Sequence, residues 1–283
     1  MSMNAPETMG VIYRLQMSQL HPHPQNPFSI RDDQAMLDLI QSVQSHGVLV
    51  PAIARPRPDG EYEIIAGHRR KHASELAGLD FMPVVVLDLN DDEAIIQLVD
   101  SNIQRENILP SERAKAYKMR MEAMKRQGAR TDLTSPNISA KFRSDDELGQ
   151  EVGVSGDTIR NYASLTNLVP ELMQMVDEGR IKLSPAYQIA ALPHNEQSLL
   201  LDTIESEQAI PSLSQAQRIK RLSQNGELNE DVLLEIMMEQ KKPVRNDITL
   251  SGEKLRKPST FFSVCSTLMG TVEVRFRASM NSS

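Results

Sequence analysis

The stretch "YEIIAGHRRKHASELAG", residues 62–78, decides the fold, because it joins a strand to a helix through one glycine. The apolar run through Ala66 is typical of a strand. The residues after Gly67 are typical of a helix, which Gly78 ends. We therefore expect an N-terminal α/β unit around this stretch.

The basic segment "GHRRKH" (67–72) inside this stretch allows three interpretations. His68 and His72 lie four residues apart, which is a common spacing for two metal ligands on a helix. Arg69 and Arg70 could instead hold a phosphate at the start of the helix. The third interpretation is a solvated basic helix that binds nothing.

The phosphate interpretation has the best physical support. The first helical turn leaves the backbone N–H groups of residues 68–70 free, and arginine forks match phosphate oxygens. Basic side chains at this end oppose the helix dipole unless an anion binds there. A metal would meet like charge from Arg69, Arg70 and Lys71, with no acidic ligand before Glu75. The segment is not a P-loop, which needs a longer glycine-rich loop and a lysine.

Periodicity and chain breakers extend the unit in both directions. We expect the other elements to be helices over 31–47, 91–106, 110–128 and 229–240, strands over 50–56 and 82–89, a loop over 128–144, and mainly helix over 145–222. The three consecutive valines of the strand over 82–89 suggest burial on both faces. The fold class is therefore α+β. A small mixed α/β domain (1–108) is followed by an all-α domain (109–222), and 223–283 holds a short helix and an irregular tail.

Composition excludes several classes of protein. Hydrophobic residues make up 40% of the chain and charged residues 24%, which is ordinary for a globular protein. Aromatic residues make up 4%, without Trp, which argues against a base-stacking platform. The single cysteine, Cys265, excludes an internal disulfide framework. Since neither a signal peptide nor a long apolar run is visible, we expect a cytoplasmic protein with no membrane partner.

Charge is segregated along the chain, although the net charge is −7. The segment 110–130, "PSERAKAYKMRMEAMKRQGAR", is predominantly basic, whereas acidic residues gather in 88–100 and 196–240. Lys115 and Lys118 of this basic helix could therefore contact the phosphates of a nucleic acid. The alternative is a solvated charged helix.

The segment "DDELGQEVGVSGDTIRNYASL" (145–165) carries the pattern of a helix-turn-helix. Leu148 and Ile159 would face each other from two helices, and Gly153 would supply the positive φ of the turn. Val154 would plug the turn, and Gly149 is small where the two helices approach closely.

The second helix of this motif would enter the major groove of DNA. Arginine can hold guanine and asparagine can hold adenine through paired hydrogen bonds. The candidate DNA contacts are Ser155, Thr158, Arg160 and Asn161. The alternative is a plain helical hairpin with a polar outer face.

A second polar segment, "SNIQREN" (101–107), ends one expected helix and precedes another. Asn102, Gln104 and Arg105 could therefore face the same pocket as Gly67. The alternative is an ordinary polar helix end.

The order of these motifs closely resembles that of the ParB family of chromosome and plasmid partition proteins. The resemblance covers roughly residues 10–195. It rests on "LHPHPQNP", "HGVLVPAIARP", "YEIIAGHRRKHASELAG", "MPVVVLDL" and "SNIQRENILPSERAKAY", followed by the helix-turn-helix.

The resemblance implies a ParB/sulfiredoxin-like N-terminal domain that binds CTP with Mg²⁺, and a helix-turn-helix domain that binds a palindromic DNA site as a homodimer. It also implies a clamp that slides on DNA, an ATPase of the ParA type as partner, and association with the nucleoid or a plasmid. By position, the nucleotide contacts would be Gly67, His68, Arg69, Arg70, Asn102 and Arg105, and Asn102 would also help to bind the metal.

Three departures from the family pattern bear on catalysis. His68 and Ser101 stand where the family usually has glutamates, and Phe28 stands where it usually has an arginine. Since Mg²⁺ prefers carboxylate oxygen, the site would be at most a weak CTPase.

Two other functions stay open. One is a transcriptional regulator on the same scaffold with a vestigial nucleotide pocket, which the two lost acids favour. The other is a phosphotransferase, because related folds include sulfiredoxin and a free-serine kinase. No base lies near Gly67 in sequence for that chemistry, although Asp88, Asp91, Asp92 and Glu93 keep it open.

Overall fold

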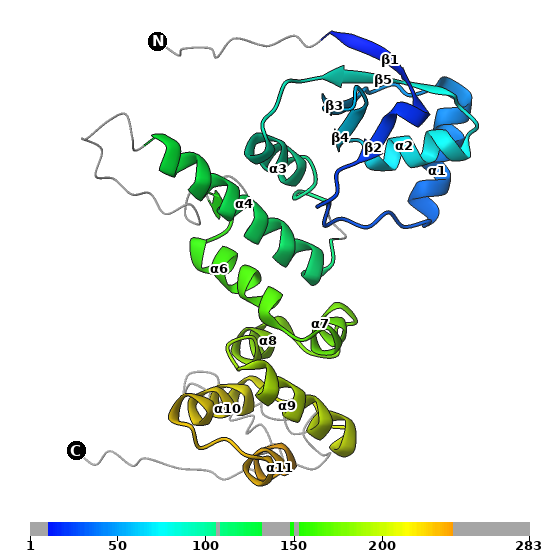
Figure 1. Ribbon diagram of the computed structural model, residues 1–283. Helices are drawn as coiled ribbons and strands as arrows, with labels where there is room; N and C mark the ends of the chain where they lie inside the picture. The colour runs from blue at the N-terminus through cyan, green and yellow to red at the C-terminus, as the bar shows by residue number, and fades with distance from the viewer. Residues whose placement is uncertain (1–10, 106–107, 132–147, 150–152, 240–283) are drawn as a thin grey trace, which may run out of the picture. The chain divides into compact units, whose positions relative to one another are not determined.

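The computed structural model describes residues 11–105, 108–131, 148–149 and 153–239 (Figure 1). The expected tail from residue 241 lies outside these ranges, as does the expected loop beyond residue 131. Within them, a mixed sheet with three helices precedes a series of helices, which confirms the predicted α+β class. None of the described helices combines the length and apolarity needed to cross a membrane.

The N-terminal part is built on a five-stranded mixed sheet with the order β1-β5-β3-β4-β2. Its strands are β1 (Ile12–Gln16), β2 (Leu20–Pro22), β3 (Ala52–Pro56), β4 (Tyr62–Ala66) and β5 (Phe81–Val86). The β1–β5 and β3–β4 pairs are antiparallel, and the β3–β5 and β2–β4 pairs are parallel. Strands β3, β4 and β5 were expected; β1 and β2, the two edges, were not.

Three helices accompany the sheet, each with a clear start signal. They are α1 (Gln34–His46), α2 (His68–Leu76) and α3 (Asp91–Asp100). The Asp33 carboxylate caps α1 by accepting from the Met36 N–H at 2.9 Å. Asn90 and Glu93 form a capping box at the start of α3, which satisfies N–H groups that a helix end leaves unpaired.

The two faces of the sheet bury different clusters. One face holds Ala52, Ala54, Ile64, Met82 and Val84, all fully buried. On the other face, Ile65 packs against Ala94 and Leu98 of α3. Alternation along β4 explains both clusters, since successive side chains of a strand point to opposite faces.

The expectation that β5 is buried on both faces is wrong in part. Met82 and Val84 are fully buried, whereas Val85 and Val86 are only half-buried and Phe81 is exposed. Strand β5 is central in the sheet, but only its Met82 and Val84 face carries the core.

The second part is entirely helical. Its elements are α4 (Pro110–Thr131), α6 (Gly156–Ser164), α7 (Pro170–Asp177), α8 (Leu183–Ile189), α9 (His194–Glu207), α10 (Leu213–Asn225) and α11 (Glu230–Met238), with the short 3₁₀ turn η2 (Leu165–Asn167). Leu172, Leu200, Ile219 and Leu233 bring α7, α9, α10 and α11 into one hydrophobic core. Helix α4 continues three residues into the segment expected to be a loop.

A cluster around Phe28 joins the two parts. Phe28 is buried with Val99 of α3, with Ile103 just after α3, and with Tyr117 of α4. Ile159 of α6 belongs to the same cluster. The Ser29 N–H donates to Glu112 Oε1 of α4 at 3.0 Å, directly beside Phe28. The segment after β2 therefore contributes to the core beneath the helix-turn-helix.

The turn between β4 and α2 admits only glycine. Gly67 has φ +105°, and a Cβ atom there would lie 2.9 Å from Ala52 Cβ and 3.1 Å from Ala52 Cα. Gly60, in the turn between β3 and β4, also has a positive φ (+86°), but a Cβ there would meet nothing within 4 Å.

Substituting each of these glycines by alanine separates backbone strain from crowding. We expect Gly60→Ala to lower the free energy of unfolding by about 1–2 kcal/mol, the cost of a left-handed non-glycine residue. We expect Gly67→Ala to cost roughly 1–3 kcal/mol more, because it also overpacks against Ala52. Urea unfolding of the two variants gives the comparison, and equal losses would contradict the crowding.

Candidate nucleotide and nucleic-acid sites

The start of α2 is an open helix end. Gly67 is its N-cap, no side chain caps the first turn, and that turn holds no acidic residue. Such an end presents free N–H groups and the positive pole of the helix dipole. Helix α2 is solvated on one side only, because His68, Ala73 and Ser74 are buried.

Arg69 and Arg70 of α2 each contact a different neighbouring segment of the chain. One Arg70 guanidinium nitrogen donates to the carbonyl oxygens of Val50 and Pro51, both at 2.6 Å. Burial lowers the pKa of Arg70. Arg69 lies 3.3 Å from the Asp33 carboxylate that caps α1. The two arginines are therefore held by the residues just before β3 and by the N-cap of α1, and both stay partly exposed.

Arg105 completes a cluster of three guanidinium groups. Burial lowers its pKa, the positive charges of Arg69 and Arg70 lower it further, and Glu112 opposes them. Arg105 forms no hydrogen bond or ion pair through its side chain with any residue that the structure describes. The structure thus brings three predicted nucleotide contacts, from α2 and from the end of α3, into electrostatic range of one another.

His68 lies in the same positive environment but carries no charge at neutral pH. Its side chain is buried, with 6% of the residue exposed. Burial lowers its pKa to about 4, with help from His23, Arg105 and Lys71. Its Nε2 atom is buried without a hydrogen-bond partner among the described residues.

The metal interpretation of the histidine pair finds no support in the geometry. His72 Nε2 lies 3.0 Å from Asp32 Oδ1 near the surface, whereas His68 is buried. Among the described residues, no three His, Cys, Asp or Glu side chains are grouped as metal ligands would be.

Asn102 is buried at the end of α3, where its position is fixed. Its Nδ2 donates to the Leu98 carbonyl at 2.8 Å and to Ser101 Oγ at 3.1 Å. Ser101 Oγ in turn donates to the Leu98 carbonyl at 2.9 Å. The Asn102 carbonyl accepts from the Arg105 N–H at 3.0 Å. The structure therefore links Asn102 to Arg105 through the backbone, but it records no contact between Asn102 and residues 67–70.

A buried polar chain beside His68 was missed by the sequence analysis. His23 Nε2 lies 3.8 Å from Glu63 Oε2, and Arg55 pairs with Glu63 at 2.6 Å and with Asp91 at 2.8 Å. The pKa of His23 is lowered by burial against the opposing charge of Glu63. In the sequence, the sign of this polar chain was the pair of histidines in "HPHPQNP" (21–27). The prolines of that segment predict an extended or turning backbone and do not indicate a buried histidine.

Residues 148–149 and 153–165 of the expected helix-turn-helix are described, and they agree with the expectation with one correction, whereas 145–147 and 150–152 lie outside the described residues. Gly153 has φ +73°, and a Cβ on Gly149 would lie 2.5 Å from the Val154 carbonyl. Leu148 and Ile159 are buried together. Val154 does not plug the turn, since it is 37% exposed. Ile159 and Leu148 already fill the space beneath the turn.

The four predicted DNA contacts lie at the exposed start and outer face of α6. Ser155 is the N-cap: its Oγ accepts from the Thr158 N–H at 3.1 Å and lies 2.9 Å from Thr158 Oγ1. Arg160 pairs with Asp157, and Asn161 is exposed. Ser155 and Thr158 therefore have a structural role as well as surface positions.

The arginines and the lysines of α4 have different surroundings. Its arginines serve the fold: Arg120 pairs with Asp100 at 2.6 Å, Arg126 pairs with Asp92 at 2.7 Å, and Arg113 lies over the Tyr162 ring. Its lysines Lys115, Lys118 and Lys125 are exposed. Arg126 is also exposed but pairs with Asp92, so among the described basic side chains of α4 the lysines are the ones left for an external anion.

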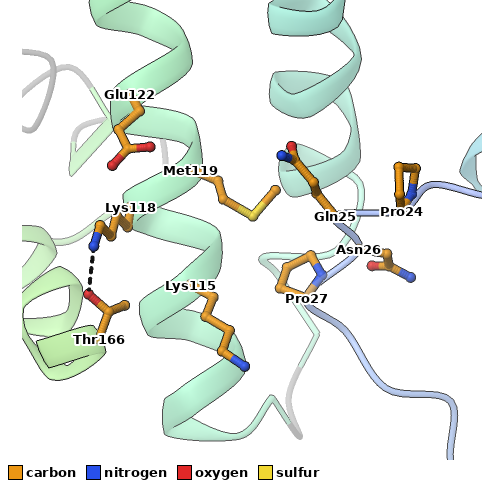
Figure 2. Close-up of a pocket in the computed structure, with 9 residues that line it drawn as sticks. All are labelled: Pro24, Gln25, Asn26, Pro27, Lys115, Lys118, Met119, Glu122 and Thr166. Carbon is orange, nitrogen blue, oxygen red and sulfur yellow. Dashed lines mark hydrogen bonds between the residues drawn. The ribbon is translucent and has the colours of Figure 1, made fainter. Parts of the chain in front are cut away.

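Two of these lysines line a hollow of about 430 Å³ between α4 and the segment 24–27 (Figure 2). Lys118 Nζ donates to Thr166 Oγ1 of η2 at 3.2 Å, and Lys115 projects from the next turn of α4. Glu122 also lines the hollow, so it is polar rather than uniformly positive.

Comparisons with known proteins agree with this architecture. Residues 1–103 match the model of the ParB N-terminal domain, and residues 137–210 match the model of the ParB HTH domain. The chromosome-partitioning protein Spo0J of Thermus thermophilus is 31% identical over 66% of this chain and 62% of its own length. The match thus spans less than two thirds of that relative.

Two solved structures are also similar to the chain. Both are C-terminally truncated ParB from Caulobacter crescentus. The one complexed to the centromeric parS site is 26% identical over 74% of this chain and 98% of its own length, with a TM-score of 0.47. The one complexed with CTP-gamma-S is 28% identical over 67% of this chain and 97% of its own length, with a TM-score of 0.32.

The two domain models match in the order in which the sheet and the helix-turn-helix follow each other here. The chain belongs to the ParB family of partition proteins.

Proposed function

We propose that this chain is a site-specific DNA-binding protein that binds a nucleoside triphosphate and acts in the partition of a chromosome, plasmid or mobile element. The triphosphate is CTP, in line with the family. From the family membership we also propose that the chain forms a homodimer on a palindromic DNA site, has a ParA-type ATPase as partner, and is located in the cytoplasm on a nucleoid or plasmid.

The observation that carries the proposal is the convergence of Arg69, Arg70 and Arg105 beside the open N-terminus of α2. Like charges gathered in a partly buried place repel one another, and they are stable there when an anion binds. A triphosphate supplies several negative charges and many acceptor oxygens. Free N–H groups of the first turn of α2 add donors of the kind that hold phosphates elsewhere.

The residues fit the triphosphate better than its metal. Mg²⁺ prefers oxygen ligands in octahedral geometry and usually takes one or two carboxylates. Asn102 could offer its amide oxygen, since only the nitrogen of that amide has a recorded partner. The nearest acid to Arg105, Glu112, already accepts from Ser29 and from the Leu109 N–H. Mg²⁺ would therefore gain little from the protein, and we propose nucleotide binding with at most weak hydrolysis.

DNA binding would use two surfaces with different tasks. Arg160 and Asn161 on α6 would read bases in the major groove, and Ser155 would approach a phosphate at the helix start. Lys115 and Lys118 of α4 would contact phosphates without reading sequence. The division of α4 between structural arginines and exposed lysines supports this assignment.

A second candidate is a transcriptional regulator that shares the DNA-binding surface but has lost nucleotide control. What favours it is a neutral, buried His68 and a Ser101 that donates to the Leu98 carbonyl, at two positions where the resemblance leads us to expect acids. Failure to bind any nucleotide, with DNA binding intact, would favour this second candidate.

For the nucleotide, we expect Arg105→Ala to raise the Kd of CTP at least about tenfold. A charge-assisted hydrogen bond contributes roughly 1.5–3 kcal/mol, and about 1.4 kcal/mol corresponds to a factor of ten. Calorimetric titration with each of the four nucleoside triphosphates, with and without DNA, measures both affinity and base preference. Arg180→Ala is the matched control, because Arg180 is exposed beyond α7 and far from α2 in sequence. Equal affinity of the two variants would contradict the role of Arg105.

For DNA, we expect Arg160→Ala and Lys118→Ala to differ in kind. Arg160→Ala should cost about 1–3 kcal/mol on the preferred palindrome and relax its sequence preference. Lys118→Ala should weaken all sequences alike and lower the slope of log K against log salt by about 1. Binding to palindromes selected from random oligonucleotides, over a range of salt, measures both effects, with the exposed Arg221→Ala of α10 as control. A change in sequence preference in Lys118→Ala would overturn the assignment.

A further inference from the structure

We propose that His68 takes up a proton when a nucleoside triphosphate binds, so that it becomes a charged contact of the phosphates and binding tightens as the pH falls. The inference deepens the proposed function and rests on it. It follows from the surroundings of His68, a position at which the resemblance leads us to expect a glutamate.

His68 is a buried polar group without a partner, placed at an open helix end. It is the first residue of α2, directly after Gly67, and only 6% of it is exposed. Its Nε2 atom has no hydrogen-bond partner among the described residues. A buried nitrogen without a partner costs stability, and it needs an explanation such as a ligand that completes it.

The groups that face His68 are mostly positive. Lys71 lies on α2 itself, Arg105 follows α3, and His23 follows β2. Arg105 is in turn close enough to Arg69 and Arg70 for their positive charges to lower its pKa. The carboxylates nearby are already engaged: Glu63 with Arg55, Glu112 with Ser29, and Glu75 with Lys71. His68 is therefore kept neutral first by burial and then by its positive neighbours, and no carboxylate of the described residues offsets them.

An entering triphosphate opposes the lowering of the His68 pKa, although it does not undo the burial. Its charge offsets that of Arg105 and Lys71, and its oxygens can accept a hydrogen bond from a protonated Nε2. The pKa of His68, about 4 in the free protein, is then higher in the complex. Because the complex binds one more proton than the separate partners, lower pH favours it. Between the free and bound pKa values of His68, the affinity rises about tenfold for each unit that the pH falls.

His23 is a poorer acceptor for this proton, although it lies in the same cluster. Its Nδ1 already accepts from the Gln25 N–H at 3.1 Å, which leaves its proton on Nε2, 3.8 Å from Glu63 Oε2. Both ring nitrogens of His23 therefore have neighbours of suitable polarity. In contrast, Nε2 of the His68 ring has no hydrogen-bond partner among the described residues.

Calorimetric titration of the full chain with CTP counts the proton directly. The measurement is made in two buffers of different ionisation enthalpy, at about pH 6 and about pH 8, on either side of the ordinary histidine pKa. CTP itself titrates in this range, so the relevant quantity is the difference between the wild type and His68→Gln. We expect the wild type to take up more protons than the variant at the lower pH and the same number at the higher pH.

Two variants serve as controls. His46→Gln changes an exposed histidine in the last turn of α1 and should leave the proton count as in the wild type. His23→Gln should also retain the extra uptake. If His23→Gln abolished the uptake and His68→Gln kept it, the proton would belong to His23 and the proposal would fail.

Proton NMR of the wild type keeps the proposal testable if His68→Gln does not fold. The chain has six histidines, so the ring resonances can be followed through a pH titration. We expect one strongly depressed histidine pKa in the free protein, raised on saturation with CTP. CTP binding with unchanged histidine titrations would overturn this inference but leave the proposed function intact. No binding of any triphosphate at either pH would overturn both.

Discussion

The contact between Gly67 and Ala52 is the constraint on which the rest of the N-terminal part depends. The turn after β4 lies so close to Ala52 at the start of β3 that a Cβ atom on Gly67 would come within 2.9 Å of the Ala52 Cβ. This approach brings the first turn of α2 over the sheet and lets Arg70 reach the Val50 and Pro51 carbonyls. The open helix end, Arg69, Arg70 and the buried His68 all follow from where this one turn places the helix, and Arg105 joins them from the segment after α3.

Charge is used in two ways that the composition does not reveal. The chain is acidic overall, with a net charge of −7. Several acids neutralise arginines inside the fold, as Asp100 does for Arg120 and Asp92 for Arg126. The positive charge that remains near α2 and along the lysines of α4 is therefore local. Attraction of anions by this molecule depends on short-range geometry, because the wider field of the protein opposes it.

Much of the fold was predictable because its signals are local. The caps at Asp33 and Asn90, the glycines at the turns and the apolar spacing of the helices each depend on a few neighbouring residues. Strands β1 and β2 were missed because short edge strands owe their pairing to distant partners such as β5 and β4.

The candidate site was predictable only in outline. Arg69 and Arg70 are adjacent in the sequence, so their presence at one site could be predicted from it. The neutrality of His68 depends on burial and on His23 and Arg105, which are far away in the chain. Likewise, the arginines and lysines of α4 look equivalent in sequence. They differ in the fold because the described arginines contact Asp100, Asp92 and Tyr162.

The cluster around Phe28 has a consequence for how the protein is made. Phe28 leaves the ribosome early, yet its partner Ile159 belongs to a much later part of the chain. At roughly 5–20 residues per second, the interval is on the order of ten seconds. During that time the aromatic ring has only its earlier partners. The nascent chain thus carries an unfinished apolar surface until the later helices of this cluster emerge.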